Sequence, residues 1–225
     1  MDTNRLQQFM VTKKVYDLMP QKKEFIIPTR SATEVRKFLK ANGLMKNVRL
    51  FSYQVEQGFN PSKAFNIGVR AAKYDRTIIT SPEVCPQTNV LAQLEELPDQ
   101  NVICQVADEN EAKQIDSVLV STSFRADTPA YYFLGCFNKA DIEKINGWDE
   151  EFMKGYAYED NDFGARWVRA GLSFVIRDDI RAVHQYHPRG ETIPGGSITN
   201  YDHFNANTAN NVIRCTNGLE KIGIE

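Results

Sequence analysis

The stretch that decides the fold of this 225-residue chain runs from Phe133 to Pro188. It holds four short motifs: Phe133-Leu-Gly135-Cys-Phe, Asn146-Gly-Trp148-Asp-Glu150, Gly155-Tyr156-Ala-Tyr158-Glu159-Asp160-Asn-Asp162, and Val183-His184-Gln-Tyr-His187-Pro188. A strand with a glycine, a tight turn, an acidic helix start and a strand that ends in histidines therefore follow one another. This order is typical of an active site assembled from separate elements.

Composition indicates one α/β domain without a strong overall charge. The chain is 42% hydrophobic and 25% charged, and its formal net charge is -2. Such a chain is long enough to bury one sizeable core. The charge balance gives no global field that would attract nucleic acid, so nucleic acid is not an expected partner. For the same reason, a transferase acting on a modified nucleobase is a weaker hypothesis than the two functions given below.

Apolar runs and cysteines favour a cytoplasmic protein. No run approaches the roughly 18 to 20 apolar residues needed to span a bilayer, and the first residues lack the apolar stretch of a signal peptide. The four cysteines are widely spaced and form no CxxC pair, so we expect all of them to be reduced and structural. They are Cys85, Cys104, Cys136 and Cys215.

Strand-like and helix-like segments alternate, which predicts a mixed sheet flanked by helices. We expect strands at 24–28, 48–53, 77–80, 101–107, 118–120, 131–135, 173–177 and 181–184, and helices at 4–19, 31–41, 61–74, 89–97, 141–145, 159–170 and 201–214. Ser31 and Glu34 form a capping-box pattern at one helix start. Residues 188–199 are rich in glycine and proline and predict a mobile, lid-like loop.

The acidic helix start has an ordinary structural explanation. Carboxylates in a first helical turn are stabilised by the helix dipole, so Glu159, Asp160 and Asp162 are expected there as capping residues. Asp162 and Arg166 lie four residues apart and predict an ion pair. Phe152 is expected to anchor the preceding turn in the core, whereas Trp148 is open to either a core or a site role.

These motifs resemble GT-A-type glycosyltransferases, especially the family 2 and C-terminal galactosyltransferase-like enzymes. The match covers about residues 45 to 190 and is most specific after Tyr131. It implies a GT-A-like (Rossmann-like) α/β fold with one mixed sheet, in which the usual first strand is either trimmed or replaced. Two registers compete for that strand. Either 25–29 is the first strand, or 4–19 is the first helix and 26–31 replaces the family's second-strand Asp-Asp-Gly-Ser segment. In the second register the usual first strand is absent, or something like 8–12 replaces it. We favour the second register.

The resemblance also implies a donor site in the first half of the chain. Donor-binding residues implied by the match are Gly58, Lys63, Asn66 and Ser81. Ser81 and Glu83 stand where the family's Asp-x-Asp motif has its two aspartates. Glu83 is thereby a ligand for a divalent metal, Mn²⁺ or Mg²⁺, and His184 and His187 are the histidines that complete such a site in metal-dependent relatives. Carboxylate oxygens suit such hard cations.

By the same resemblance, the second half carries the acceptor and the catalytic groups. Asp160 is the implied base that deprotonates an acceptor hydroxyl, with Glu159 as a hydrogen-bonding partner. The implied acceptor-binding residues are Gly135, Trp148, Tyr156 and Tyr158. Aromatic faces stack on the apolar faces of sugar rings, which suits a glycan acceptor.

We therefore predict a single glycosyltransferase-like domain over 1–225, with a nucleotide-sugar-binding half (1–107), an acceptor and catalytic half (108–190), and a loop and C-terminal helix (191–225). Its predicted activity is inverting, metal-dependent transfer of a sugar from a nucleotide sugar, UDP-linked, to an acceptor hydroxyl. The alternative is a glycosyltransferase-like binding or assembly module that has lost donor turnover, because its N-terminus is trimmed and Ser81 stands in place of the first aspartate of the Asp-x-Asp motif.

Overall fold

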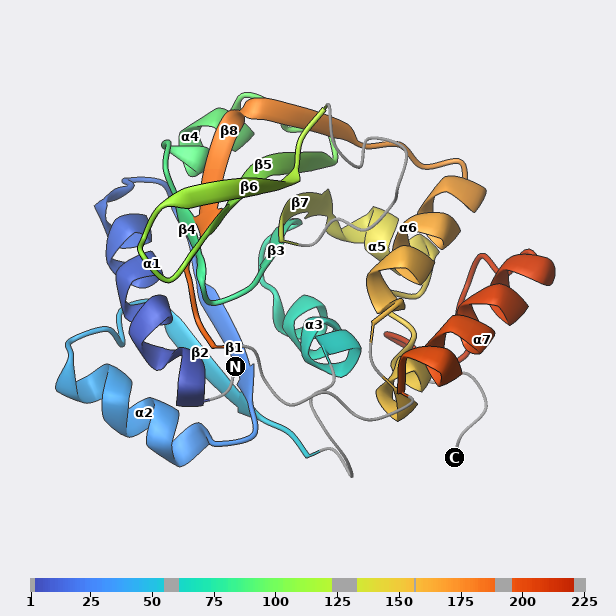
Figure 1. Cartoon of the computed structure of the whole chain (residues 1–225), viewed down its shortest axis with the longest axis horizontal. Coiled ribbons are helices and arrows are strands. Elements are labelled where there is room, and N and C mark those ends of the chain that lie inside the picture. The colour runs from blue at the N-terminus through green and yellow to red at the C-terminus, as the bar shows by residue number, and fades with distance from the viewer. Residues whose placement is uncertain (1–2, 55–60, 123–132, 156, 189–195, 221–225) are drawn as a thin grey trace.

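A computed structural model of the protein describes residues 3–54, 61–122, 133–155, 157–188 and 196–220. Figure 1 shows strands at the centre, with α1 and α2 on one side and α6 and α7 on the opposite side. In chain order the elements are η1 (Thr3–Arg5), α1 (Leu6–Leu18), β1 (Phe25–Thr29), α2 (Ala32–Ala41), β2 (Val48–Ser52), α3 (Pro61–Ala71), β3 (Arg76–Thr80), β4 (Val84–Pro86), α4 (Val90–Glu95), β5 (Val102–Glu109), β6 (Ile115–Val120), β7 (Leu134–Asn138), α5 (Lys139–Lys144), η2 (Glu150–Lys154), α6 (Glu159–Arg169), β8 (Val175–His184) and α7 (Gly196–Ala209).

The main sheet is mixed, as predicted. Its strand order is β3-β7-β5-β8-β4, and β6 pairs with β5 at the side. β5 and β8 run parallel, so both end at the same edge of the sheet, with Asp108 beside His184. Ligands of open α/β sheets bind at the carboxyl ends of parallel strands. The topology therefore brings the end of β5 and the histidines after β8 to one edge.

The N-terminal part corrects one expectation and supports another. Residues 8–12, considered as a replacement first strand, lie inside α1, whereas the helix expected at 4–19 is present. The first strand of the described chain is β1, which pairs in parallel with β2 through the crossover helix α2. Ser31 occupies the N-cap of α2, but its side chain makes no capping hydrogen bond, so the capping box predicted with Glu34 does not form.

Apolar side chains cover both faces of the main sheet. Side chains of successive strand residues point to opposite faces: Val102, Cys104 and Val106 join one cluster with α1 and α4, whereas Ile103 joins the other cluster with α5 and α6. A third cluster lies between α1, α2 and the β1–β2 pair. Every cluster is therefore built from segments distant in sequence.

Several further expectations can be compared with the structure. All four cysteines are buried and unpaired, as predicted. The two strands expected at 173–177 and 181–184 form one strand, β8, with an irregular register opposite Cys104 and Gln105. Residues 189–195 of the predicted lid-like loop lie outside the described residues, whereas 196–199 begin α7. Among the helices that the structure describes, none has the length and apolarity needed to cross a bilayer.

Candidate active site

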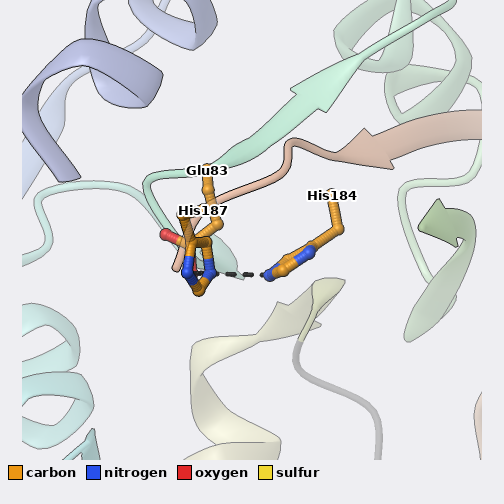
Figure 2. A group of neighbouring side chains, drawn as sticks. All are labelled: Glu83, His184 and His187. Atoms are coloured by element: carbon orange, nitrogen blue, oxygen red, sulfur yellow. Dashed lines mark ion pairs between the residues drawn. The ribbon is translucent and has the colours of Figure 1, made fainter. Parts of the chain in front are cut away.

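Glu83, His184 and His187 form a compact cluster at the edge of the main sheet. Their ligand atoms all lie within 4.8 Å of one another. Glu83 Oε1 is 3.6 Å from His184 Nε2 and 3.4 Å from His187 Nε2. Figure 2 shows these side chains converging from the turn before β4 and from the end of β8. The pairing of Val84 with His184 explains this meeting, because it places the two chain segments side by side.

Neighbouring groups orient both imidazoles with Nε2 toward Glu83. His184 Nδ1 lies 2.9 Å from the Asp108 carboxylate, and His187 Nδ1 lies 2.9 Å from the backbone oxygen of Pro188. Because both partners are hydrogen-bond acceptors, we assign a proton to each Nδ1, which then donates a hydrogen bond. In the neutral imidazole the lone pair is then on Nε2, the arrangement in which histidines bind metals.

Electrostatics at this cluster favour an ionised carboxylate. Burial alone raises the pKa of the Glu83 carboxyl, but its contacts with the His184 and His187 imidazoles outweigh burial and lower that pKa to about 2. Burial lowers the pKa of His184, whereas Glu83 and then Asp108 raise it, and the net direction is upward. The cluster therefore holds negative charge on Glu83 throughout the neutral pH range.

The donor set of this cluster fits a divalent cation. Glu83 Oε2 is buried and has no hydrogen-bond partner within the part of the chain that the structure describes. A buried carboxylate oxygen without a partner is costly, and a bound ion would supply that partner. One carboxylate and two imidazoles oriented by their own hydrogen bonds suit such an ion as protein ligands, and this set leaves positions for substrate or water.

Helix α1 packs against this cluster through a group of amide contacts. The Gln185 side-chain amide donates to the backbone oxygens of Glu83 and Gln8 and to Thr12 Oγ1. The Gln8 side chain donates in return to the backbone oxygen of Tyr186. Arg5, just before α1, has its Nε 3.7 Å from Glu83 Oε1. The N-terminal helix therefore forms part of the cluster's wall.

The acidic motif lies at the start of α6, after a strained turn. Ala157 and Tyr158 both have positive φ angles, 64° and 70°, which residues other than glycine rarely adopt. The buried Asn200 of α7 donates to the backbone oxygens of Ala157 and Phe152, which holds the turn in place. Such strain persists only where the surroundings enforce it, and it is common at functional sites.

Behind the acidic motif is a fully paired buried network. Asp162 and Arg166 are both completely buried and form the predicted ion pair, with Arg166 Nε 2.6 Å from Asp162 Oδ2. Arg166 also donates to the backbone oxygens of Ile145 and Gly147. The Asn207 amide of α7 donates to the second Asp162 oxygen at 2.9 Å. Asp162 is therefore a structural residue that fixes α6 against the turn at Gly147.

Three predicted site residues have structural positions instead. Trp148 is completely buried and stacks on Phe163 with 4.1 Å between ring centroids, so in this structure it has no surface for an acceptor sugar. Asn66 is also completely buried, and its amide bonds the backbone of Trp148 on both sides. Gly135 is buried in β7, between β3 and β5. These positions correct the expected acceptor contacts of Trp148 and Gly135 and the donor contact of Asn66.

Of four further residues predicted to contact the donor or the acceptor, the structure describes Tyr158 and Lys63. Tyr158 is half-buried, and its ring packs on Tyr201 and Phe204 of α7. Lys63 Nζ donates to the backbone oxygen of Gln54, and Lys63 is not among the described residues that line the cavity below. Gly58 and Tyr156 lie outside the described residues.

A cavity of about 1980 Å³ is lined both by the cluster of Glu83, His184 and His187 and by the acidic motif. Its walls include predicted residues from both halves of the chain: Ser81, Glu83, Glu159, Asp160, His184 and His187. Asp108 and Arg5 also line it, and sequence reasoning missed both. Asp108 follows a predicted strand whose end meets the end of the histidine strand, so the edge rule for parallel strands was a usable signal. No sequence pattern pointed to Arg5.

Comparisons with known proteins agree with this geometry. Residues 118–189 match a family model described as the N-terminal domain of galactosyltransferase. A search of curated protein sequences found no match. The matched segment contains the glycine strand, the acidic motif and both histidines of the cluster.

Solved structures show a similar fold at low sequence identity. TarS of S. aureus superimposes with a TM-score of 0.67 and 11% identity, over 93% of this chain and 39% of that chain. A mannosyltransferase from Pyrobaculum calidifontis, in complex with GDP-Man and Mn²⁺, gives 0.58 and 13%, over 92% and 67%. GalNAc-T7 with UDP, GalNAc and Mn²⁺ gives 0.57 and 13%, over 80% and 42%.

This likeness confirms the predicted GT-A-like α/β fold. The chain spans 39% of TarS, 67% of the mannosyltransferase and 42% of GalNAc-T7, so these proteins contain further sequence that it does not match. The family model matches residues 118–189, and the likeness to the solved structures concerns the fold.

Proposed function

We propose that this chain, with its GT-A fold, transfers a sugar from a nucleotide sugar, UDP-linked, to an acceptor hydroxyl with inversion at the anomeric carbon. One observation carries the proposal: a shared cavity contains the Glu83, His184 and His187 cluster together with Glu159 and Asp160. The reaction needs a cation for the leaving diphosphate and a base for the attacking hydroxyl. The cavity offers a candidate for each.

The donor side would hold a divalent metal through Glu83, His184 and His187. When bound, such an ion neutralises the charge that grows on the diphosphate as the sugar leaves. Two imidazoles favour a first-row transition ion such as Mn²⁺ over Mg²⁺, whose sites are built from oxygen. Asp108 would fix the His184 ring, and the neighbouring Ser81 hydroxyl would face the nucleoside or its phosphates.

On the acceptor side, Asp160 would act as the base. The acceptor oxygen forms the new bond to the anomeric carbon while the bond from that carbon to the diphosphate oxygen breaks, and the hydroxyl proton passes to Asp160. Asn161 N–H donates to Asp160 Oδ1 at 2.8 Å, which orients the carboxylate. Glu159 would hydrogen-bond a hydroxyl of the donor or of the acceptor. Tyr158 remains the aromatic candidate for contact with an acceptor sugar.

Similar proteins support the proposed ligand classes. TarS in complex with UDP-GlcNAc and GalNAc-T7 in complex with UDP favour a UDP-linked donor. Two of the similar structures contain Mn²⁺, one with GDP-Man and one with UDP. Their sequence identity is 11 to 13%, so the proposal depends on the residues of this chain's cavity rather than on those ligands.

The test measures nucleotide release and sugar transfer with Mn²⁺ and a panel of UDP-Gal, UDP-GalNAc, UDP-GlcNAc and GDP-Man. We expect turnover with a UDP-sugar, and a loss of at least about 100-fold in Asp160→Asn with the affinity for UDP unchanged. The anomeric configuration of the product, read by NMR, tests inversion. Asp202→Asn, an exposed carboxylate on α7, is the matched control and should keep full activity.

The same measurements separate the alternative function. A binding or assembly module would bind a nucleotide sugar by calorimetry but would release nucleotide equally slowly in the wild type and in Asp160→Asn. If no nucleotide sugar binds, with or without Mn²⁺, the proposed function is wrong.

A further inference from the structure

We propose that the Arg5 guanidinium is the counter-cation of the Glu83 carboxylate while metal is absent. When metal and nucleotide bind, the guanidinium leaves Glu83 and pairs with the donor's diphosphate. This inference rests on the proposed function for the identity of the two ligands. It assigns a role in donor binding to a residue outside the matched family segment, which covers 118–189.

Arg5 lies on the same oxygen that the two histidines face. Its Nε is 3.7 Å from Glu83 Oε1, and the His184 and His187 Nε2 atoms are 3.6 Å and 3.4 Å from that oxygen. The Arg5 side chain is only 16% exposed. At these lengths the contacts are charge interactions rather than good hydrogen bonds. Glu83 is therefore surrounded by positive and polar groups without being tightly bound to any of them.

The position of Arg5 is fixed by the fold and does not depend on one flexible side chain alone. Arg5 ends the 3-10 turn η1 and directly precedes α1. Gln185, next to His184, ties α1 to the metal cluster through Gln8, Thr12 and the backbone of Glu83. Because the helix is held at the cluster, the guanidinium stays in the cavity even after it leaves Glu83.

Charge decides how Arg5 affects each ligand. In the cluster of Glu83, His184 and His187, the carboxylate that would bind a divalent cation already pairs with Arg5, so the guanidinium weakens metal binding. A diphosphate brings negative charge into the same cavity and gives the guanidinium a new partner, since arginine pairs well with phosphate oxygens. Metal and nucleoside diphosphate should therefore bind cooperatively, and Arg5 should supply part of that coupling.

Calorimetric titration of Mn²⁺ into the whole protein, with and without UDP, tests this role. Without UDP, we expect Arg5→Gln to bind Mn²⁺ at least about threefold more tightly than the wild type does. With UDP, the gain in Mn²⁺ affinity should be at least about threefold smaller in Arg5→Gln than in the wild type. Arg5→Lys, which keeps the charge, should lie close to the wild type in the first measurement.

Two controls separate the possible outcomes. Arg177→Gln removes an arginine paired with Asp179, away from the described cavity lining, and should change neither affinity. Equal or weaker Mn²⁺ binding in Arg5→Gln, or an unchanged effect of UDP, overturns the role of Arg5 alone. If Mn²⁺ does not bind the wild type, or binds Glu83→Gln equally well, the proposed metal site fails and this inference fails with it.

Discussion

Glu83 and Asp162 are both buried carboxylates, yet their surroundings differ in one decisive respect. Asp162 receives short hydrogen bonds on both oxygens, at 2.6 Å from Arg166 and 2.9 Å from Asn207. Glu83 has neighbours at 3.4 to 3.7 Å around one oxygen, and its other oxygen has no partner within the described residues. A saturated buried carboxylate stabilises the fold, whereas an unsaturated one indicates a ligand site.

Each carboxylate has its own bracing helix. α1 packs beside β4 and the cluster of Glu83, His184 and His187, and α7 packs beside α6 and η2 at the opposite side of the molecule (Figure 1). Arg5, which directly precedes α1, places a cation next to Glu83. Asn207 of α7 instead donates a hydrogen bond to Asp162. The difference predicts that matched amide substitutions at the two positions damage different properties.

The largest expected effect is on stability, in Asp162→Asn. The substitution leaves the Arg166 guanidinium completely buried without its ionic partner, which should lower the free energy of unfolding by about 3 kcal/mol. Urea denaturation followed by fluorescence measures the change. Asp179→Asn is the matched control: Asp179 also lies 2.6 Å from its arginine, but that pair is exposed, and its loss should cost less than about 1 kcal/mol. Equal losses would contradict the contrast in burial.

The second effect is on ligand binding, in Glu83→Gln. We expect Mn²⁺ affinity to fall at least about 100-fold, because the site loses its only carboxylate ligand among the clustered residues. The free energy of unfolding should fall less than it does in Asp162→Asn, since the contacts of Glu83, at 3.4 to 3.7 Å, are longer than the hydrogen bonds of Asp162. Calorimetry and urea denaturation measure the two quantities. A large loss of stability with unchanged Mn²⁺ affinity would make Glu83 a structural residue like Asp162.

Much of the fold was predictable because it depends on local pattern. Alternating strand and helix segments predicted the layered sheet, and the pair at Asp162 and Arg166 followed from helical spacing. The cluster of Glu83, His184 and His187, implied by the resemblance to known glycosyltransferases, does assemble in the structure.

What sequence did not reveal depends on long-range packing. Trp148 was an open choice between core and acceptor because an aromatic residue suits both, and only the stacking on Phe163 decides it. Asp108 meets His184 through the register of two parallel strands, and Arg5 meets Glu83 through the docking of α1. The end of a predicted strand was a signal for Asp108, whereas no pattern in the sequence pointed to Arg5.

The smallest expected effect concerns the pH dependence of the α7 brace. His203 Nε2 lies 2.9 Å from Asp149 Oδ2 and 3.5 Å from the Asn207 amide, and the charges of Asp162 and Glu151 also act on it. The hydrogen bond with Asp149 raises the pKa of His203 and outweighs partial burial. Burial raises the pKa of Asp149, but His203 and the Glu151 N–H outweigh burial and lower that pKa.

The two directions fix the pH window of this contact. A raised histidine pKa gives stability that is fully present below about pH 6.5 and is lost as pH rises through the folded-state value. A lowered aspartate pKa gives stability that is present above about pH 4 and is lost as pH falls through its folded-state value. The contact should therefore stabilise the protein most near pH 5 to 6 and least at alkaline pH.

Thermal unfolding of His203→Gln at several pH values checks this window. The deficit in Tm relative to the wild type should be about 2 °C larger near pH 5.5 than at pH 9. His203 also packs edge-on against Phe152, with 4.8 Å between ring centroids, and loss of that contact lowers Tm equally at every pH. The difference between the two pH values therefore isolates the charge interaction, and Asp202→Asn provides the control for a nearby exposed charge. A deficit that stays constant with pH would mean that α7 braces the acidic helix by packing and neutral hydrogen bonds alone.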